Sequence, residues 1–292
     1  MQASELILRP NGRIYHLGLR PEQLAPLIIT VGDPGRVARV SRYFDRVECR
    51  VREREFVTHT GWLGKKRLSV VSTGIGPDNV DIVLNELDAL FNIDLEKRQI
   101  KTQFTPLTLI RLGTAGGLQE EIPVDAFVAS SGAFGMDGLL QYYRAESQQK
   151  HALVNALRAH CGDQWQFPLS PYFAEAAPDL LLRFPAGVFH YGITATHPGF
   201  YGPQGRQLRA PVQQPDYLNL LQSFNEGGRK ILNLEMETAA IYGLSRLLGH
   251  RAVSLSAILA NRARGTFSKK PAQTVKRLLE TALAIISSDI ES

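Results

Sequence analysis

The chain has 292 residues, enough to bury a sizeable core as one large α/β domain or two small ones. Its 33 basic and 28 acidic residues give a net charge of +5, and the basic residues are scattered instead of forming a stripe, which suits anionic small molecules at least as well as nucleic acid. No Pro/Ser-rich linker or shift in composition divides the sequence, so we predict a single domain over residues 1–292, with a polar extension at 1–13.

Cysteine content and hydrophobic patterning bear on the compartment. Cys49 and Cys161 are the two cysteines, and they show neither a CxxC motif nor metal-like spacing. We therefore expect a reducing compartment, no disulfide framework and no metal site. Residues 1–20 lack the apolar core of a secretion signal, and no run of 18 apolar residues occurs. We expect a cytoplasmic protein without a membrane partner.

The first predicted strand runs into a glycine-rich turn. A short apolar segment at residues 14–19 carries His16, and a lone histidine of this kind is typical of packing or of a surface. Residues 26–31 predict a buried strand, which is followed by Gly32-Asp-Pro-Gly-Arg36. Backbone N–H groups beside the Arg36 guanidinium are suited to phosphate, although an ordinary tight turn explains the glycines equally well.

The next segment repeats the pattern of strand, glycine turn and helix. Residues 68–72 predict a strand that enters Thr73-Gly-Ile-Gly-Pro77. Apolar residues at helical spacing over 80–87 then predict a helix, with Asp78 as its N-cap. Residues 94–106 are polar and charged, and we interpret them as a surface excursion.

An arginine lies inside the third predicted strand, residues 107–112, which ends at Gly113-Thr-Ala-Gly-Gly117. Because arginine is almost never fully buried without an anionic partner, Arg111 predicts that a negative group meets it. A further strand is predicted over residues 125–131, and residues 146–160 predict an amphipathic surface helix.

One loop combines groups that can recognise a planar ligand. Residues 187–196 predict a strand that opens into a loop at 197–206, which glycine and proline restrict. Gln204 can donate and accept hydrogen bonds, whereas Arg206 can only donate. Together they can read the edge of a pyrimidine while Phe200 packs against its ring. A surface loop with solvated polar residues is the alternative.

Two carboxylates end the next predicted strand, over residues 231–235. Glu235 and Glu237 precede a helical run of small residues, and a carboxylate there can bind the vicinal hydroxyls of a ribose. The alternative is that they complement the dipole of the helix. Residues 251–260 predict the last strand, and Pro271 begins a helix with one apolar face.

Strands that alternate with helices, with glycine turns at strand ends, predict an α/β fold. We expect a single domain with a mixed, largely parallel sheet flanked by helices. In such a sheet, ligands bind at the carboxyl ends of the strands.

Six motifs in sequence order resemble the nucleoside phosphorylases, and in particular the uridine phosphorylases. They are Gly32-Asp-Pro-Gly-Arg36, Arg54-Glu-Phe56, Ser72-Thr-Gly-Ile-Gly76, Arg111-Leu-Gly-Thr114, the residues from Phe200 through Arg206, and Glu235-Met-Glu237. The resemblance runs from about His16 to the carboxyl-terminal helix. The Gln204/Arg206 pair separates this branch from the hexameric purine enzymes, which carry an aspartate where this chain has Asn261-Arg262.

The resemblance implies phosphate-dependent cleavage of uridine to uracil and ribose 1-phosphate, with inorganic phosphate as a co-substrate and no cofactor. It implies a homodimer that assembles to a hexamer, with each site shared across the dimer interface. It implies that phosphate is bound by Gly32, Arg36, Arg111 and Thr114, with Arg54 from a neighbour. Ribose is assigned to Met236, Glu237 and the neighbour's His16, and the base to Phe200, Gln204 and Arg206. The catalytic residues are then Arg36, Arg111, Arg206 and Glu237.

The sequence departs from this family at several positions. Ala115 replaces a threonine, and Gly202-Pro203 reverses the usual order. Asn79 occupies the position of a serine that, in the family, helps to bind a monovalent cation beside Glu55 and Ile75, so we make no prediction for that cation. The 91–106 excursion is also longer than is usual in the family. Purine phosphorolysis, nucleoside hydrolysis and non-catalytic nucleoside binding are the alternatives. Hydrolysis would leave the phosphate arginines without a ligand.

Overall fold

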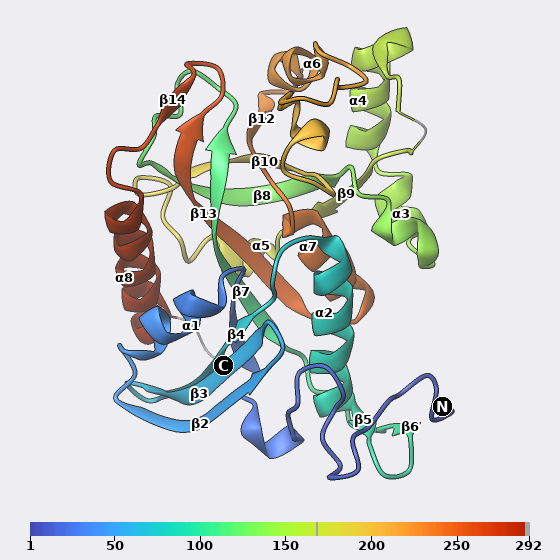
Figure 1. The fold of residues 1–292 in the computed structure, drawn as a ribbon, viewed down its shortest axis with the longest axis vertical. Coiled ribbons are helices and arrows are strands. Elements are labelled where there is room, and N and C mark those ends of the chain that lie inside the picture. Colours follow the sequence, from blue (N-terminus) through green and yellow to red (C-terminus); the bar gives the residue numbers. More distant parts are fainter. Residues whose placement is uncertain (168, 290–292) are drawn as a thin grey trace.

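The computed structural model describes residues 1–167 and 169–289, and one long sheet organises them (Figure 1). Across these residues, twelve strands form the sheet in the order β11-β12-β10-β8-β13-β7-β1-β4-β3-β2, with β9 beside β8 and β14 beside β13. The strands are β1 (Leu27–Val31), β2 (Arg46–Glu53), β3 (Phe56–Leu63), β4 (Lys66–Ser72), β7 (Thr108–Gly117), β8 (Phe127–Gly135), β9 (Tyr172–Glu175), β10 (His190–Thr196), β11 (Asn225–Glu226), β12 (Arg229–Glu235), β13 (Arg251–Asn261) and β14 (Thr266–Phe267).

The sheet is mixed, as the sequence predicts. Strand β1 pairs in parallel with β4 and β7, β13 pairs in parallel with β7, and β10 pairs in parallel with β8 and β12. Antiparallel pairs occupy the edges, such as β2 with β3, and also join the two parallel groups through β13 with β8. The parallel strands therefore bring several carboxyl ends together near the middle of the fold.

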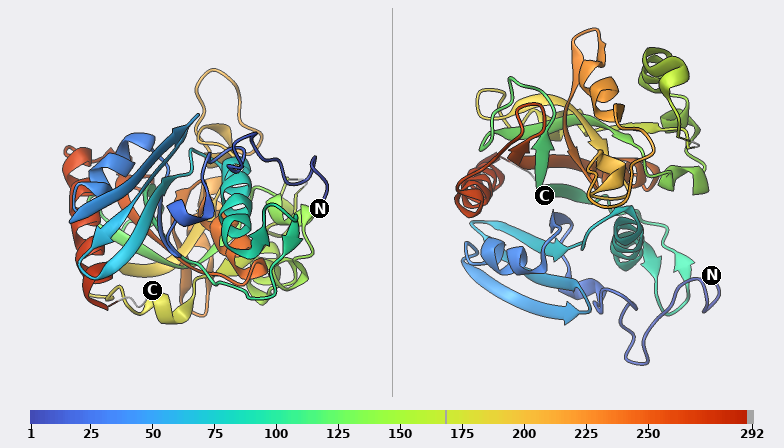
Figure 2. Two further views of the ribbon diagram at one scale, coloured as in Figure 1. Left: turned by 90° about the horizontal axis from the view of Figure 1, so that it is seen from below. Right: turned by 45° about the horizontal axis from the view of Figure 1, so that its top comes forward.

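Helices cover both faces of the sheet. They are α1 (Pro34–Ser41), α2 (Pro77–Asn92), α3 (Glu146–Gln149), α4 (Ala152–Cys161), α5 (Pro178–Leu181), α6 (Tyr217–Ser223), α7 (Thr238–Leu247) and α8 (Pro271–Asp289). In Figures 1 and 2, α1 and α8 lie on one side of β7 and β13, and α2 and α7 lie on the other. A short hairpin of β5 (Ile93–Asp94) and β6 (Gln99–Ile100) forms the predicted surface excursion.

Alternate residues of the central strands supply the two main apolar cores. In β1, Ile28 packs with the residues of α2 and α7, whereas Leu27, Ile29 and Val31 pack with those of α1 and α8. This alternation follows from the two-residue period of a strand, and it explains why β1 is apolar except at Thr30. Among the described residues, no helix is both long and apolar enough to cross a membrane.

Three sequence predictions need correction. Helix α2 begins at Pro77 with Gly76 as its N-cap, because Gly76 has φ +100°, so Asp78 lies inside the first turn. The predicted helix over 146–160 is two helices, because the His151 side chain accepts a hydrogen bond from Leu153 N and starts α4 anew. Strand β7 continues through its glycines to Gly117, where it pairs with β12 and β13.

Candidate functional site

A cavity of about 530 Å³ opens at the carboxyl ends of the central strands. It is lined by nine of the eleven predicted site residues, Gly32, Arg36, Arg111, Thr114, Phe200, Gln204, Arg206, Met236 and Glu237. They come from the turn after β1 and the first turn of α1, from β7, from the loop after β10, and from the junction between β12 and α7. Residues that are up to 205 positions apart in the sequence, from Gly32 to Glu237, therefore share one cavity.

Arg111 is buried at the base of this cavity. Its Nη2 lies 2.5 Å from Glu237 Oε2 and 3.0 Å from Glu235 Oε2, and its Nη1 lies 3.3 Å from Ser256 Oγ. The prediction that a negative group meets Arg111 is confirmed. Gly113 makes room for this arrangement, since a Cβ at that position would lie 2.0 Å from Arg111 Nη1.

The two carboxylates have different surroundings. Glu235 accepts hydrogen bonds from Thr196 Oγ1 at 2.6 Å and from the backbone N–H groups of Glu237 and Thr238, both at 2.9 Å. It therefore caps the start of α7, as the dipole interpretation proposed. Glu237 accepts one backbone hydrogen bond, from Gly76 N at 3.0 Å, besides its contact with Arg111. Burial raises the pKa of Glu237, and Arg111 opposes this effect.

Arg36 brings a second guanidinium to the same end of the cavity. Its Nη1 donates to Leu112 O at 3.1 Å, and among the described residues its buried Nε has no hydrogen-bond partner. Burial lowers the pKa of Arg36, and repulsion from Arg111 adds to this effect. A partly buried cation with an unused donor is stabilised by an anion, so this end of the cavity is suited to an oxyanion.

The opposite end of the cavity carries the planar-ligand residues. Gln204 is buried, and its Oε1 accepts a hydrogen bond from Arg206 Nη1 at 2.7 Å. The Arg206 guanidinium lies 3.8 Å from the centroid of the Phe200 ring. Burial and the neighbouring Arg262 lower the pKa of Arg206 to about 10. An electron-rich planar group would be stabilised between these cations.

Arg262 also lines this end of the cavity, and sequence reasoning did not place it there. Its Nη1 donates to Gln204 O at 3.0 Å, and its backbone N–H donates to Gly117 O at 2.7 Å. Its place in the cavity could have been predicted from its position directly after a buried strand, β13, because ligand-binding residues often follow strand ends.

His16 and Arg54, the remaining predicted residues, do not line the cavity of their own chain. His16 Nδ1 lies 2.6 Å from Glu86 Oε1. The Arg54 guanidinium stacks on the Tyr15 ring at 5.4 Å, beside a separate surface depression. Among the described residues, no three His, Cys, Asp or Glu side chains are grouped closely enough to bind a metal ion.

Comparisons with known proteins give a consistent result. The sequence profile of the phosphorylase superfamily matches residues 26–290. The uridine phosphorylase of Thermococcus kodakarensis is 29% identical over 278 residues, which cover 95% of this chain and 88% of the relative. A DeoD-type purine nucleoside phosphorylase of Clostridium perfringens is 27% identical over 271 residues, covering 92% and 96%. The solved structure of a Trypanosoma brucei nucleoside phosphorylase, described as showing uridine phosphorylase activity, superimposes with a TM-score of 0.87 at 30% identity, covering 97% of this chain and 99% of that one.

Proposed function

Since this chain belongs to the phosphorylase superfamily, we propose that it cleaves uridine with inorganic phosphate to give uracil and ribose 1-phosphate. The observation that carries this proposal is the pair of arginines at one end of the cavity, where Arg36 keeps an unused buried donor beside Arg111. The relatives from Thermococcus kodakarensis and Trypanosoma brucei support uridine as the substrate.

Phosphate would bind at the Arg36 end of the cavity. Arg36 supplies positive charge, Arg111 lines the cavity near it, Thr114 supplies a hydroxyl, and Gly32 has no side chain to cover its backbone N–H group. The positive charge of Arg111 is already neutralised by Glu235 and Glu237. Arg36 is therefore the arginine whose positive charge is available to phosphate. This proposal makes Arg36 the main anchor of phosphate and Arg111 the group that holds Glu237 in place.

Ribose would lie between the two ends of the cavity. Glu237 keeps acceptor capacity for the 2′- and 3′-hydroxyls, because two carboxylate oxygens can accept about four hydrogen bonds and the protein supplies two, from Gly76 and Arg111. Met236 packs against the sugar, and Phe200 packs against the base. Gln204 and Arg206 read the base edge, with Arg262 behind them.

The reaction needs no nucleophilic side chain. Phosphate attacks C1′ as the glycosidic bond breaks, the sugar acquires positive charge, and the electron pair of the bond leaves with uracil. Arg206 and Arg262 place two guanidinium groups where that negative charge develops. Arg36 fixes the attacking phosphate on the other side of the sugar. Catalysis is therefore positioning and electrostatic stabilisation.

Pyrimidine is favoured over purine by the residues at the base end. The relative from Clostridium perfringens is a purine enzyme at similar identity, so overall likeness does not separate the two substrates. The Gln204/Arg206 pair offers one donor-and-acceptor amide and one donor-only guanidinium, which match a ring that bears carbonyls and one N–H. Arg262 follows Asn261 where the purine enzymes have an aspartate that can donate a proton.

We further propose that the working enzyme is a homodimer that assembles to a hexamer in the cytoplasm. His16 and Arg54 lie outside the cavity of their own chain, and both are near a surface that also holds Tyr15 and Glu86. A neighbouring subunit that presents Arg54 to phosphate and His16 to the 5′-hydroxyl would complete the site.

The test is a comparison of uridine cleavage with and without phosphate. Purified protein is incubated with uridine, the absorbance change of the pyrimidine is followed, and ribose 1-phosphate is assayed directly. We expect uracil release only when phosphate is present. Release without phosphate would identify a hydrolase, release from inosine alone would identify a purine enzyme, and tight nucleoside binding without any release would identify a binding protein. Each of these three outcomes contradicts the proposal.

A further inference from the structure

The loop that carries Phe200, Gln204 and Arg206 is long, and its two end residues lie side by side. It begins at His197, directly after β10, and ends at Tyr217, the first residue of α6. Residues 207–211, in its middle, are all exposed. A segment with so few buried side chains opens locally more easily than the sheet around it, unless specific contacts hold it. The direction of the polar side chains at the base end therefore depends on the contacts that fix this loop.

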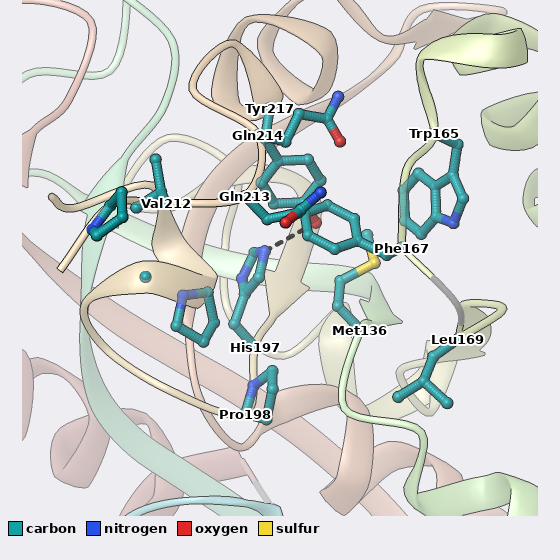
Figure 3. A pocket seen from close by; sticks show the side chains of 13 residues that line it. Met136, Trp165, Phe167, Leu169, His197, Pro198, Val212, Gln213, Gln214 and Tyr217 are labelled. Atoms are coloured by element: carbon teal, nitrogen blue, oxygen red, sulfur yellow. Dashed lines mark hydrogen bonds between the residues drawn. The ribbon is translucent and has the colours of Figure 1, made fainter.

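A second cavity, of about 350 Å³, lies against the same loop (Figure 3). The loop contributes Pro198, Gly202, Pro203 and residues 211–214 to its lining. This cavity has no lining residue in common with the first one. Along these residues the loop faces a space instead of packed side chains, so it lacks the packing that holds a buried segment in place.

A hydrogen bond joins the two ends of the loop. His197 Nε2 lies 3.0 Å from Tyr217 Oη, as the dashed line in Figure 3 shows, and the two rings meet edge to face with 5.6 Å between their centroids. The two residues are 1% and 3% exposed. Because both are buried, water does not replace a lost partner there, and breaking this hydrogen bond costs more than it would at the surface. The hydrogen bond closes residues 198–216 into a ring.

Both partners of this hydrogen bond are held in place. Burial lowers the pKa of His197 to about 3, and an interaction of the ring with the backbone of Ala195 opposes this shift, so the ring is neutral at physiological pH. We assign the Tyr217 phenol as the donor to Nε2. The Tyr217 ring meets Phe167 edge to face with 4.8 Å between centroids, and Trp165 at 6.1 Å. The ends of the loop are therefore anchored to the body of the protein.

The start of α6 also supports the base end of the first cavity. Leu218, which follows Tyr217, packs against Gly205, where an added Cβ would lie 3.0 Å from Leu218 Cγ. Gly205 has φ +63°, a conformation that favours glycine, and it turns the chain between Gln204 and Arg206. A displacement of the start of α6 therefore removes the support of the turn that joins these two residues.

We propose that His197 and Tyr217 are positioning residues, whose hydrogen bond holds the loop closed and keeps Gln204 and Arg206 directed at the base. The part that concerns the base rests on the proposed function, whereas closure of the loop does not. Neither His197 nor Tyr217 lines the first cavity, so neither touches the substrate there. Their effect on the reaction passes through the loop and the start of α6.

Limited proteolysis tests closure of the loop without reference to catalysis. Tyr217→Phe removes only the hydroxyl and leaves His197 Nε2 buried without its donor, so the loop should open more often. Trypsin cleaves after Arg209, which is exposed in the middle of the loop, and mass spectrometry follows the fragments 1–209 and 210–292. We expect cleavage about three- to tenfold faster than in the wild-type protein, because the rate follows the population of the open loop.

Three further variants make this measurement specific. Tyr191→Phe is the matched control, because its hydroxyl donates to Leu181 O at 3.1 Å, outside the loop, so cleavage should not change. His197→Phe removes the same hydrogen bond from its other side and should match Tyr217→Phe. Arg209→Ala should abolish the two fragments, which identifies the cleaved bond.

Steady-state kinetics test the positioning role. In Tyr217→Phe we expect the KM for uridine and the inhibition constant of uracil each to rise roughly 3- to 10-fold, because Gln204 and Arg206 would contact both ligands. The KM for phosphate should stay unchanged, because Arg36 lies at the other end of the cavity. A loss of stability alone would not separate the two substrates in this way.

Each outcome bears on one part of the proposal. Equal tryptic cleavage in Tyr217→Phe and Tyr191→Phe would overturn closure of the loop by this hydrogen bond, whether or not the protein cleaves uridine. Faster cleavage with an unchanged uridine KM, or an equal rise in the KM of both substrates, would overturn the positioning role. A wild-type protein that cleaves no uridine would contradict the proposed function and the positioning role with it, and the proteolysis would still decide closure of the loop.

Discussion

Glu235 and Glu237 share one guanidinium nitrogen, because Arg111 Nη2 lies 3.0 Å from the first carboxylate and 2.5 Å from the second. Although they share this contact, the two carboxylates have different roles. Glu235 is surrounded by donors from Thr196 and from the first residues of α7, so its acceptor sites are used by the fold. Glu237 keeps unused acceptor capacity in the cavity. The same motif therefore joins a structural carboxylate to one that is available for substrate.

Paired substitutions should separate these two carboxylates. Glu235→Gln replaces one acceptor oxygen with an NH₂ group that faces backbone donors, so we expect a loss of about 1–3 kcal/mol in the free energy of unfolding. Glu237→Gln keeps an acceptor for Gly76 N, so its stability should change less. Its kcat/KM for uridine should fall roughly 10- to 100-fold, because charge-assisted hydrogen bonds to ribose are lost. Urea denaturation and steady-state kinetics measure both, and the reverse ranking would contradict the division.

Phosphate affinity should depend on Arg36. Arg36→Ala removes the cation that keeps an unused buried donor, so we expect the KM for phosphate to rise roughly 10- to 100-fold. Arg39→Ala is the matched control, because Arg39 is an exposed arginine on the same helix, α1, outside the cavity. Initial rates are measured against phosphate at saturating uridine. Equal phosphate KM values in the two variants would show that phosphate does not bind at Arg36.

Local sequence predicted the buried strands but not the outer ones. Residues 26–31 and 231–235 have a clear apolar pattern because both faces of β1 and β12 are covered. Strand β2, Arg46–Glu53, is an edge strand whose residues alternate between exposed and partly exposed, so its charged composition resembles a surface segment. Helix α1 was not predicted, because its glycine and proline start was interpreted either as a phosphate-binding turn or as an ordinary tight turn.

The site was predictable to the extent that its residues follow strand ends. Arg111 and Glu237 were found because a buried arginine needs an anion and a carboxylate at a strand end faces a ligand. The separate task of Glu235 depends on Thr196, which lies 39 residues earlier, so it required the structure. Arg262 likewise reaches the base end because β13 pairs with the glycine end of β7, a long-range relationship.

Base recognition should depend on Arg206. We expect Arg206→Ala to retain the fold and to lose roughly 10²- to 10³-fold in kcat for uridine, because a donor aimed at the charge on the leaving base is removed. Arg209→Ala, at an exposed arginine outside the cavity, is the control and should keep normal turnover. Circular dichroism verifies folding. A folded Arg206→Ala protein with near-normal uridine turnover would disprove the assignment of the base end.

Asp137 should give the protein a distinctive pH dependence of stability. Its carboxylate, just after β8, accepts hydrogen bonds from Tyr172 Oη at 2.9 Å and Leu139 N at 2.8 Å. Burial nevertheless raises the pKa of Asp137 from 3.8 to about 6. The folded state therefore binds the Asp137 proton more tightly than the unfolded state does. As a result, Asp137 stabilises the fold at low pH, and this contribution is lost as the pH rises from about 4 to about 6.

Asp137→Asn isolates this effect because it keeps an acceptor for Tyr172 and Leu139 but cannot ionise. Between pH 4 and pH 7, we expect the free energy of unfolding of the wild-type protein to fall by about 1–2 kcal/mol relative to that of Asp137→Asn. This is less than the full shift in the pKa of Asp137 implies, because the residue is partly exposed. Urea denaturation at each pH gives the difference, in which the other titrating groups cancel. Asp163→Asn, at an exposed aspartate, controls for loss of a surface charge. A wild-type protein that gains stability relative to Asp137→Asn over this range would show that the carboxylate, and not the protonated acid, is the form that the fold prefers.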